Sequence, residues 1–279
     1  MEAGRFVVVG DSFSEGVGDP HVLYPNGFRG WADRLARQLG RQDPRWEYAN
    51  FAIRSKLLDE VVAEQLDAAL ALRPTHVSFH AGGNDILSLR ADMDSLMGRY
   101  ADAVGRLSRQ VPVVVLFTIF DPRTTAVLEP LRRRLQVFNG TVRELAAAHG
   151  TLLVDHALLR EYDDPRLWAP DRIHLSRPGH KRMAAAVLET LGWDHTLRIK
   201  DLGSRERRSW RTTVLDEVSF VRGEVVPLVR RRIRGVRDGD HTPPKWPVPI
   251  RPAEGLKRLA GTCSGAALLD GTPRARARG

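Results

Sequence analysis

The stretch VVVGDSFSEGVG, Val7–Gly18, runs from three consecutive valines into glycine, acidic and serine residues. A valine run is typical of a buried β-strand, and a glycine permits the tight turn that ends one. Ser12 therefore lies just past the carboxyl end of a predicted strand. Two interpretations are open there: Ser12 is the N-cap of a helix, or it is a nucleophile that a general base activates.

Four further apolar runs follow in the first 155 residues, and helical patterns lie between them. Such alternation implies β-α units, a parallel sheet and helices on both faces. We expect an α/β fold, a flavodoxin-like three-layer α/β/α sandwich with a five-stranded parallel sheet and a C-terminal helical extension. Strands are predicted at residues 6–9, 46–51, 76–79, 113–117 and 152–154, and helices at residues 30–39, 57–72, 93–107, 128–148 and 183–191.

The alternation weakens near residue 195, and we divide the chain into three regions. Residues 1–195 form the expected α/β domain. Residues 196–237 contain a predicted amphipathic helix over 214–235, whose acids come early and whose arginines come late, as the helix dipole favours. Residues 238–279 are rich in Pro, Gly and Arg, which predicts a linker and a poorly ordered tail.

The positive charge is concentrated in the last part of the chain. The formal net charge is +9, and residues 201–279 carry +8 of it, so residues 1–200 are close to neutral. A near-neutral body without interleaved aromatic and basic residues argues against nucleic-acid binding. The basic tail instead suggests weak contact with an anionic surface or docking of a partner.

Membrane, secretion and disulfide signals are missing from this sequence. No apolar run approaches the ~20 residues that span a bilayer, and the first residues do not follow the pattern of a signal peptide. The single cysteine, Cys263, rules out a disulfide framework. We therefore expect a soluble cytoplasmic protein without an integral membrane segment.

Two more polar motifs follow predicted strands. Gly82–Asp85, GGND, comes after the third strand and reads either as a turn with an Asx cap or as a loop whose Asn84 amide stabilises an oxyanion. Asp171 and His174 come after the fifth strand and read either as an ordinary loop pair or as a base with its orienting carboxylate.

Taken together, these motifs favour the chemical interpretation, because they supply a nucleophile, an oxyanion donor, an orienting acid and a base. No G-x-S-x-G occurs, so the α/β-hydrolase nucleophile elbow is excluded. In order and spacing, GDSFSEG, NFAIRS (Asn50–Ser55), GGND and DRIH (Asp171–His174) resemble the four blocks of the SGNH hydrolases, the GDSL-type esterases and lipases. The resemblance covers about residues 5–192, two thirds of the chain.

The resemblance implies a role for each matching residue. Ser12 would be the nucleophile, His174 the base and Asp171 its orienting acid. The oxyanion hole would comprise the Ser12 N–H, the Ser55 N–H and the Asn84 amide. Ser55 stands where the family commonly has glycine, and Phe13 where it commonly has leucine. Supporting positions in the same blocks are Asp11, Gly83 and Asp85.

The resemblance also implies hydrolysis of a carboxylic ester without a metal or organic cofactor. A short acyl ester, a lipid ester and an O-acetyl sugar are all compatible with the fold. The alternatives are an enzyme whose basic C-terminal region docks a partner or anionic surface, or a non-catalytic binding protein of this fold. We expect truncation after about residue 196 to leave ester hydrolysis largely intact.

Residues near these motifs receive plainer interpretations. His80 is expected to be a satisfied residue at a strand end, His180 a packing or surface residue, and Arg54 a solvated side chain. Trp168 precedes the Asp-His loop and is considered as a wall of the substrate pocket.

Overall fold

The computed structural model describes residues 4–88, 91–121, 129–203, 223 and 239–266. Their strands form one sheet in the order β5-β4-β3-β1-β2-β6. The first five strands pair in parallel, and β6 pairs antiparallel with β2. The strands are β1 (Arg5–Gly10), β2 (Glu47–Asn50), β3 (His76–His80), β4 (Val113–Phe117), β5 (Leu152–Val154) and β6 (Trp246–Ile250).

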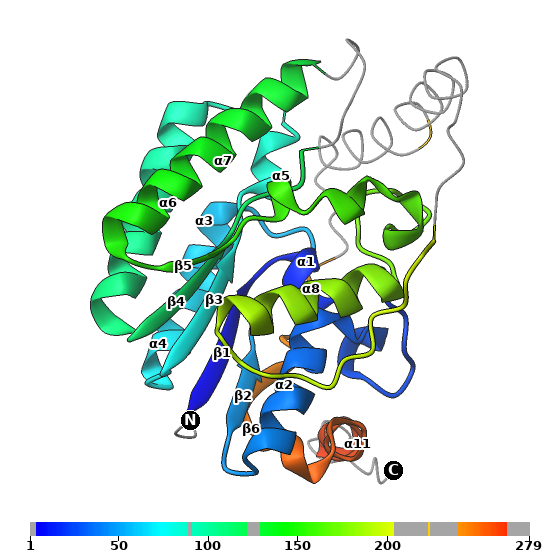
Figure 1. The fold of residues 1–279 in the computed structure, drawn as a ribbon. Helices are drawn as coiled ribbons and strands as arrows, with labels where there is room; N and C mark the ends of the chain where they lie inside the picture. Colours follow the sequence, from blue (N-terminus) through cyan, green and yellow to red (C-terminus); the bar gives the residue numbers. More distant parts are fainter. Residues whose placement is uncertain (1–3, 89–90, 122–128, 204–222, 224–238, 267–279) are drawn as a thin grey trace, which may run out of the picture.

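Helices cover both faces of the sheet, as the alternating pattern predicted. In Figure 1, α6 and α7 lie on one side of the sheet, and α2 and α8 lie on the other. The helices are α1 (Ser12–Glu15), α2 (Gly30–Gln42), α3 (Leu58–Val61), α4 (Asp67–Ala71), α5 (Gly83–Ile86), α6 (Met93–Gln110), α7 (Glu129–His149), α8 (Arg177–Thr190) and α11 (Leu256–Ala266).

Strand β1 shows how the apolar runs hold the layers together. Phe6 and Val8 pack into the cluster beneath α2 and α8, while Val7 and Val9 pack into the cluster beneath α6 and α7. Successive side chains of a strand point to opposite faces, so a continuous apolar strand is the pattern for a sheet covered on both sides. The three-layer α/β prediction is therefore confirmed.

The strand order places a crevice at the carboxyl end of β1. The chain leaves β1 to form β2 on one side and later returns to form β3 on the other side. Ligand sites of open α/β sheets lie at such a switch point. Helix α1 follows β1 directly, and α5 follows β3 closely, so both short helices begin at this edge of the sheet (Figure 1).

The sixth strand was not predicted. The sequence WPVPI of β6 reads as part of a proline-rich linker, yet Ile250 pairs with Tyr48 and Trp246 with Asn50. Proline is tolerated in an edge strand, because its missing N–H faces away from the neighbouring strand. Trp246 is buried, whereas Val248 is 59% exposed. The expected five-stranded sheet is corrected to six strands.

The region expected to be a linker and poorly ordered tail also contains α11. Leu256 and Ala260 of this helix are buried in the core cluster that contains β1 and α2. The amphipathic helix predicted over 214–235 falls outside the described residues, apart from the single position 223. Among the described helices, none combines the length and the apolar character that crossing a membrane requires.

Candidate active site

His174 lies between Ser12 and Asp171 and contacts both. The Ser12 Oγ is 3.0 Å from His174 Nε2, and Asp171 Oδ2 is 2.7 Å from His174 Nδ1. Ser12 is the first residue of α1, and the other two residues belong to the loop before α8. The structure thus brings together three residues that the sequence separates by up to 162 positions.

The loop before α8 holds its shape through the Asp171 carboxylate. Asp171 Oδ1 accepts hydrogen bonds from the backbone N–H groups of Ile173 and His174, both at 3.0 Å. The backbone then closes on itself, because the Ala169 N–H donates to the His174 carbonyl at 2.8 Å. A side chain that bonds its own backbone two and three residues on is the Asx-turn arrangement. Asp171 therefore orients the imidazole through both the backbone and the ring.

Electrostatics at this pair fix the proton on one ring nitrogen. Burial raises the pKa of Asp171, but hydrogen bonds from the His174 ring and the two backbone N–H groups outweigh it, so the pKa lies below its usual value. An ionised carboxylate only accepts hydrogen bonds, so His174 Nδ1 must donate. In neutral imidazole Nε2 is then the acceptor for the Ser12 hydroxyl.

The turn after α1 packs directly against the His174 loop. Gly18 has φ 97°, and a Cβ built there would lie 2.2 Å from the Leu175 carbonyl oxygen. A side chain at Gly18 would therefore push the nucleophile turn away from the histidine. This close approach helps to set the Ser12–His174 distance.

Ser55 lies in the turn after β2 with a left-handed backbone, at φ 64°. The preceding residue, Arg54, donates its backbone N–H to Glu15 Oε2 at 2.7 Å. Ile53, which precedes Arg54, donates its N–H to the Gly10 carbonyl at 3.2 Å. The second sequence block therefore lies against the end of β1 and against α1.

The third block lies beside the first block and contacts the residues that directly follow the second. Asn84 Nδ2 donates to the Lys56 carbonyl at 2.8 Å, and the Leu58 N–H donates to Asp85 Oδ2 at 3.0 Å. A Cβ built on Gly83 would lie 4.0 Å from the Asp11 carboxylate, which places this block beside the first one. The structure therefore gathers the blocks around Ser12, Ser55 and Asn84 at one edge of the sheet.

Asp11 supports the nucleophile helix from a buried position. Its Oδ1 caps α1 by accepting from the Phe13 N–H at 3.1 Å, and it also lies 3.3 Å from His80 Nδ1. Asp11 is 3% exposed and His80 is 7% exposed. His80 is thus a partnered residue at a strand end, as expected.

Sequence reasoning missed Glu15 and gave Arg54 the wrong environment. Glu15 is fully buried, and its carboxylate accepts from the Arg54 guanidinium at 2.5 Å as well as from the Arg54 backbone. Arg54 is therefore not a freely solvated side chain, since it ties α1 to the turn that contains Ser55. An acid in the GDSFSEG block and an arginine in the NFAIRS block were the available signals.

Two other residues, His180 and Trp168, serve the packing around the site. His180 is fully buried and its Nε2 lies 2.9 Å from the Val17 carbonyl, while burial lowers the pKa of this ring to about 3. Trp168 donates from Nε1 to the Tyr162 carbonyl at 2.7 Å and stacks on His156. Through these contacts, His180 and Trp168 pack around the loop that contains Asp171 and His174.

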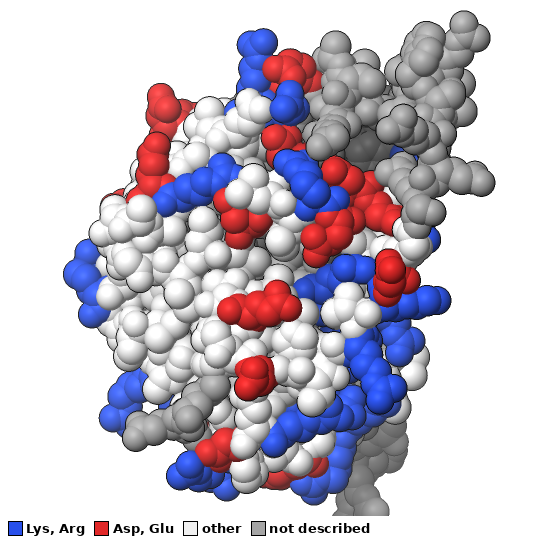
Figure 2. Space-filling view, viewed as in Figure 1, with Lys and Arg blue, Asp and Glu red and all other residues white. Residues whose placement is uncertain are grey.

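A cavity of about 690 Å³ lies between α2 and α8, and no triad residue lines it. Nine of its lining residues are cationic and none of the described ones is acidic. In the view of Figure 2, many Lys and Arg side chains gather on the right-hand part of the molecular surface. The cationic residues of the cavity are Arg29, Arg34, Arg37, Arg41, Arg177, Lys181, Arg182, Arg198 and Lys200. Elsewhere in the described chain, no group of His, Cys, Asp or Glu side chains has the arrangement of a metal site.

One protein family matches most of the chain. The model of the GDSL-like lipase/acylhydrolase family matches residues 8–182. No curated protein matches the chain.

Solved structures share the fold at low sequence identity. A catalytic mutant of the acetylxylan esterase Axe2 from Geobacillus stearothermophilus is 19% identical with a TM-score of 0.59, over 70% of this chain and 97% of that one. LAE5, an alpha/beta hydrolase enzyme from the metagenome of Lake Arreo, Spain, is 24% identical with a TM-score of 0.57, over 69% and 97%. Both matches leave part of this chain uncovered.

Proposed function

Because the chain belongs to the GDSL-like lipase/acylhydrolase family, and is thereby a carboxylic ester hydrolase, we propose that it works through a Ser12–His174–Asp171 acyl-enzyme mechanism. The observation that carries this proposal is the unbroken series of contacts from Ser12 Oγ to His174 Nε2 and from His174 Nδ1 to Asp171. A nucleophile bonded to a base that a third group orients is the arrangement needed to activate a serine.

The proposed reaction has two halves. His174 Nε2 takes the hydroxyl proton as Ser12 Oγ attacks the ester carbonyl, and the imidazolium that forms is stabilised by Asp171. His174 then returns the proton to the departing alcohol as the acyl-enzyme forms. A water molecule, deprotonated by His174, attacks the acyl group, and collapse of that intermediate restores Ser12 and releases the acid.

The oxyanion of each tetrahedral intermediate needs donors at the same edge of the sheet. We assign this role to the N–H groups of Ser12 and Ser55 and to the Asn84 amide. Hydrogen bonds from Arg54 to Glu15 and from Asn84 to Lys56 hold the contributing loops against one another. Donors fixed before the charge develops need no reorganisation, and losing one typically costs ~10²–10³ in rate.

For the substrate we favour a short acyl group, and an O-acetyl carbohydrate before a lipid ester. Ser12, Ser55, Asn84 and His174 are all partly exposed rather than enclosed, which suits a soluble substrate. The structurally similar proteins from Geobacillus stearothermophilus are acetylxylan esterases, and they share this fold.

The test compares hydrolysis of p-nitrophenyl acetate, p-nitrophenyl octanoate, acetylated xylo-oligosaccharide and a lysophospholipid. We expect the acetyl esters to be cleaved fastest, and Ser12→Ala and His174→Ala to lose ~10⁴-fold or more in kcat, as losses of triad members do. The exposed residues Ser95 and His149 provide matched controls, since Ser95→Ala and His149→Ala should keep wild-type rates.

Two results would contradict the proposal separately. Full activity in a folded Ser12→Ala protein would remove the nucleophile assignment. Octanoate or lysophospholipid cleavage far above acetate cleavage would leave the mechanism in place and reverse the substrate preference.

A further inference from the structure

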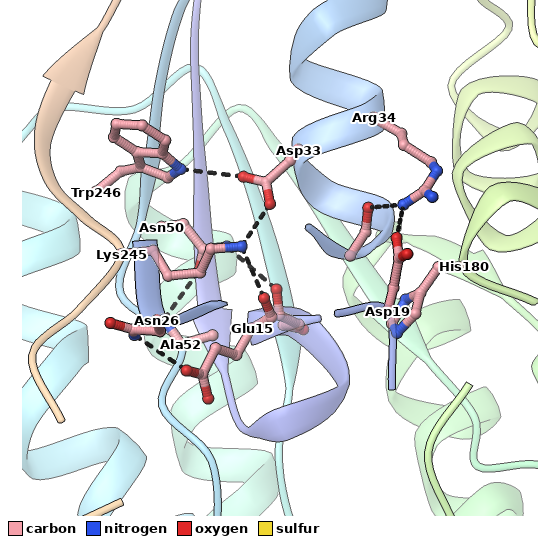
Figure 3. A network of polar contacts seen from close by, with 12 residues as sticks. Glu15, Asp19, Asn26, Asp33, Arg34, Asn50, Ala52, His180, Lys245 and Trp246 are labelled. Atoms are coloured by element: carbon pink, nitrogen blue, oxygen red, sulfur yellow. Dashed lines mark hydrogen bonds and ion pairs between the residues drawn. The ribbon is translucent and has the colours of Figure 1, made fainter. Parts of the chain in front are cut away.

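Helix α1, which begins with Ser12, is a single turn, and its last carbonyl groups have partners from elsewhere in the chain. The terminal carbonyls of a helix lack intrahelical donors. Asn50 Nδ2 donates to the Ser14 carbonyl at 3.1 Å, and Lys245 Nζ donates to the Glu15 carbonyl at 2.9 Å. Figure 3 shows Lys245 reaching this turn from the segment that leads into β6.

Lys245 has a site built for its charge. Its side chain is fully buried, and its Nζ pairs with the fully buried carboxylate of Asp33 on α2. The same carboxylate accepts from Trp246 Nε1 at 3.0 Å and from the Tyr48 hydroxyl at 3.2 Å. Burying an ammonium group is costly unless it is paired and hydrogen-bonded. Both requirements are met beneath α1.

The segment before β6 also touches the turn that contains Ser55. A Cβ built on Gly239 would lie 2.1 Å from the Arg54 carbonyl oxygen. The Pro243 carbonyl accepts from Asn26 Nδ2, which donates to Glu15 Oε1 as well, both at 3.0 Å. One short segment thus contacts the nucleophile turn and the adjoining turn of the second block.

From these contacts we infer that Lys245 is a positioning residue for catalysis, and that residues 239–246 complete the active site by fixing the nucleophile turn and the Ser55 turn. The inference rests on the proposed role of Ser12. The segment lies outside residues 8–182, the part of the chain that the family model matches. It also reverses the expectation that truncation after residue 196 leaves hydrolysis intact.

The decisive variant removes the donor without stranding a charge. In Lys245→Met combined with Asp33→Asn, methionine fills the space of the lysine stem up to Cε, and the asparagine oxygen still accepts from Trp246 and Tyr48. Misplacing a nucleophile by about 1 Å can cost ~10²-fold in rate. We expect kcat on p-nitrophenyl acetate to fall roughly 10–100-fold, with KM nearly unchanged. Labelling of Ser12 by a fluorophosphonate should slow in parallel.

A matched control tests the same chemistry at an exposed place on the C-terminal segment. Arg258 and Glu254 form a surface ion pair on and beside α11, with side chains 66% and 47% exposed. The double variant Arg258→Met, Glu254→Gln should keep wild-type kcat, KM and labelling rate.

Wild-type kcat in a folded Lys245→Met, Asp33→Asn protein would overturn the inference. If that protein does not fold, Gly239→Ala decides, because its methyl group must displace the Arg54 carbonyl. A folded Gly239→Ala protein should lose kcat with KM unchanged, and an unaltered kcat would overturn the inference. Failure of the proposed function itself looks different, since the wild-type protein would then not be labelled at Ser12.

Discussion

Ser55 shows how one residue can carry strain at the site. Its φ of 64° lies in the left-handed region, which costs an L-residue roughly 1–2 kcal/mol and glycine almost nothing. The sequence revealed that a serine replaces the usual glycine, but the backbone conformation came only from the structure. The turn is held by its neighbours, because the Arg54 N–H and guanidinium are both fixed on Glu15.

We predict that Ser55→Gly stabilises the protein by about 0.5 kcal/mol, the relief of strain less the greater chain entropy of glycine. The N–H is retained, so kcat/KM should stay within about twofold. Ser55→Val should instead destabilise by about 2 kcal/mol, because a β-branched residue tolerates this conformation poorly. Urea unfolding and p-nitrophenyl acetate hydrolysis measure both effects. A tenfold loss of activity in Ser55→Gly would show that the hydroxyl itself matters.

Asp85 is expected to make stability depend on pH. Burial raises its pKa to about 6 despite the hydrogen bond from the Leu58 N–H. The folded protein therefore binds this proton more tightly than the unfolded chain, whose Asp pKa is about 3.9. Stability must then fall as the pH rises from about 4 to about 6 and stay level above that range.

Asp85→Asn should remove this dependence. The amide oxygen still accepts from Leu58, so we expect a gain of about 2 kcal/mol at pH 7 and almost none at pH 4. Urea unfolding at both pH values measures the difference. An equal effect at the two pH values would contradict the assignment of the titration to Asp85.

The site residues that were predicted stand in short sequence motifs, whereas the missed residue Lys245 depends on partners far away in the sequence. Ser12, Asn84, Asp171 and His174 stand in short motifs, so each could be named before its neighbours in space were known. Lys245 gave no such signal, because its partners Asp33 and Glu15 lie 212 and 230 positions away. Local sequence does not specify a buried ion pair of that separation.

Among the elements, the five parallel strands were predictable and the antiparallel edge strand β6 was not. A strand covered on both faces is mostly apolar, and β1 and β4 show that signal plainly. An edge strand needs only one partner, so β6 tolerates two prolines and an exposed valine. Its register depends on Trp246 reaching Asp33, which is a tertiary contact.

The predicted helix over residues 57–72 is interrupted by a π-helical turn. Residues Val62–Leu66 form a π-helical turn between α3 and α4, and such turns are frequent at functional sites. The turn holds Gln65, whose amide accepts from the Gly10 N–H and donates to the Gly10 carbonyl, both at 2.9 Å. The side chain thereby anchors the end of β1, two residues before Ser12.

Gln65→Met should destabilise the protein by about 1–3 kcal/mol, since it leaves the buried Gly10 N–H without its partner and leaves the Gly10 carbonyl with only the Ile53 N–H. We also expect kcat to fall while KM changes little, because the end of β1 is freed. Thermal unfolding and p-nitrophenyl acetate kinetics report the two effects. The exposed Gln136 of α7 provides the control, as Gln136→Met should alter neither quantity. Wild-type stability in Gln65→Met would show that water replaces both hydrogen bonds.

At the scale of the whole molecule, the cavity between α2 and α8 concentrates positive charge in a body whose net charge is small. Burial and the surrounding arginines, Arg34 and Arg29 first among them, lower the pKa of Lys181. Like charges held together by the fold repel one another, and a bound anion relieves that repulsion.

We predict that low-millimolar tripolyphosphate raises Tm by a few degrees, whereas sodium chloride of equal ionic strength does not. Replacing Arg37, Arg177 and Arg198 of the cavity by glutamine should abolish most of the shift. Differential scanning calorimetry measures it.

A charge-matched control separates the cavity from the overall positive charge. Glutamine at Arg109, Arg251 and Lys257, which are exposed and lie outside the cavity lining, removes the same charge. This variant should keep the tripolyphosphate shift. Equal losses in both triple variants would show that the anion responds to net charge alone.

If Lys245 positions the Ser12 turn, as inferred above, its pairing with Asp33 also sets the earliest point in synthesis at which the chain can hydrolyse an ester. These residues are 212 positions apart, so at roughly 5–20 residues per second Asp33 leaves the ribosome some ten to forty seconds before its partner. Until then β2 is an unpaired sheet edge, open to pairing with other chains. The arrival of β6 closes that edge and braces the Ser12 turn in one step, so a nascent chain would gain protection from aggregation and hydrolytic activity together.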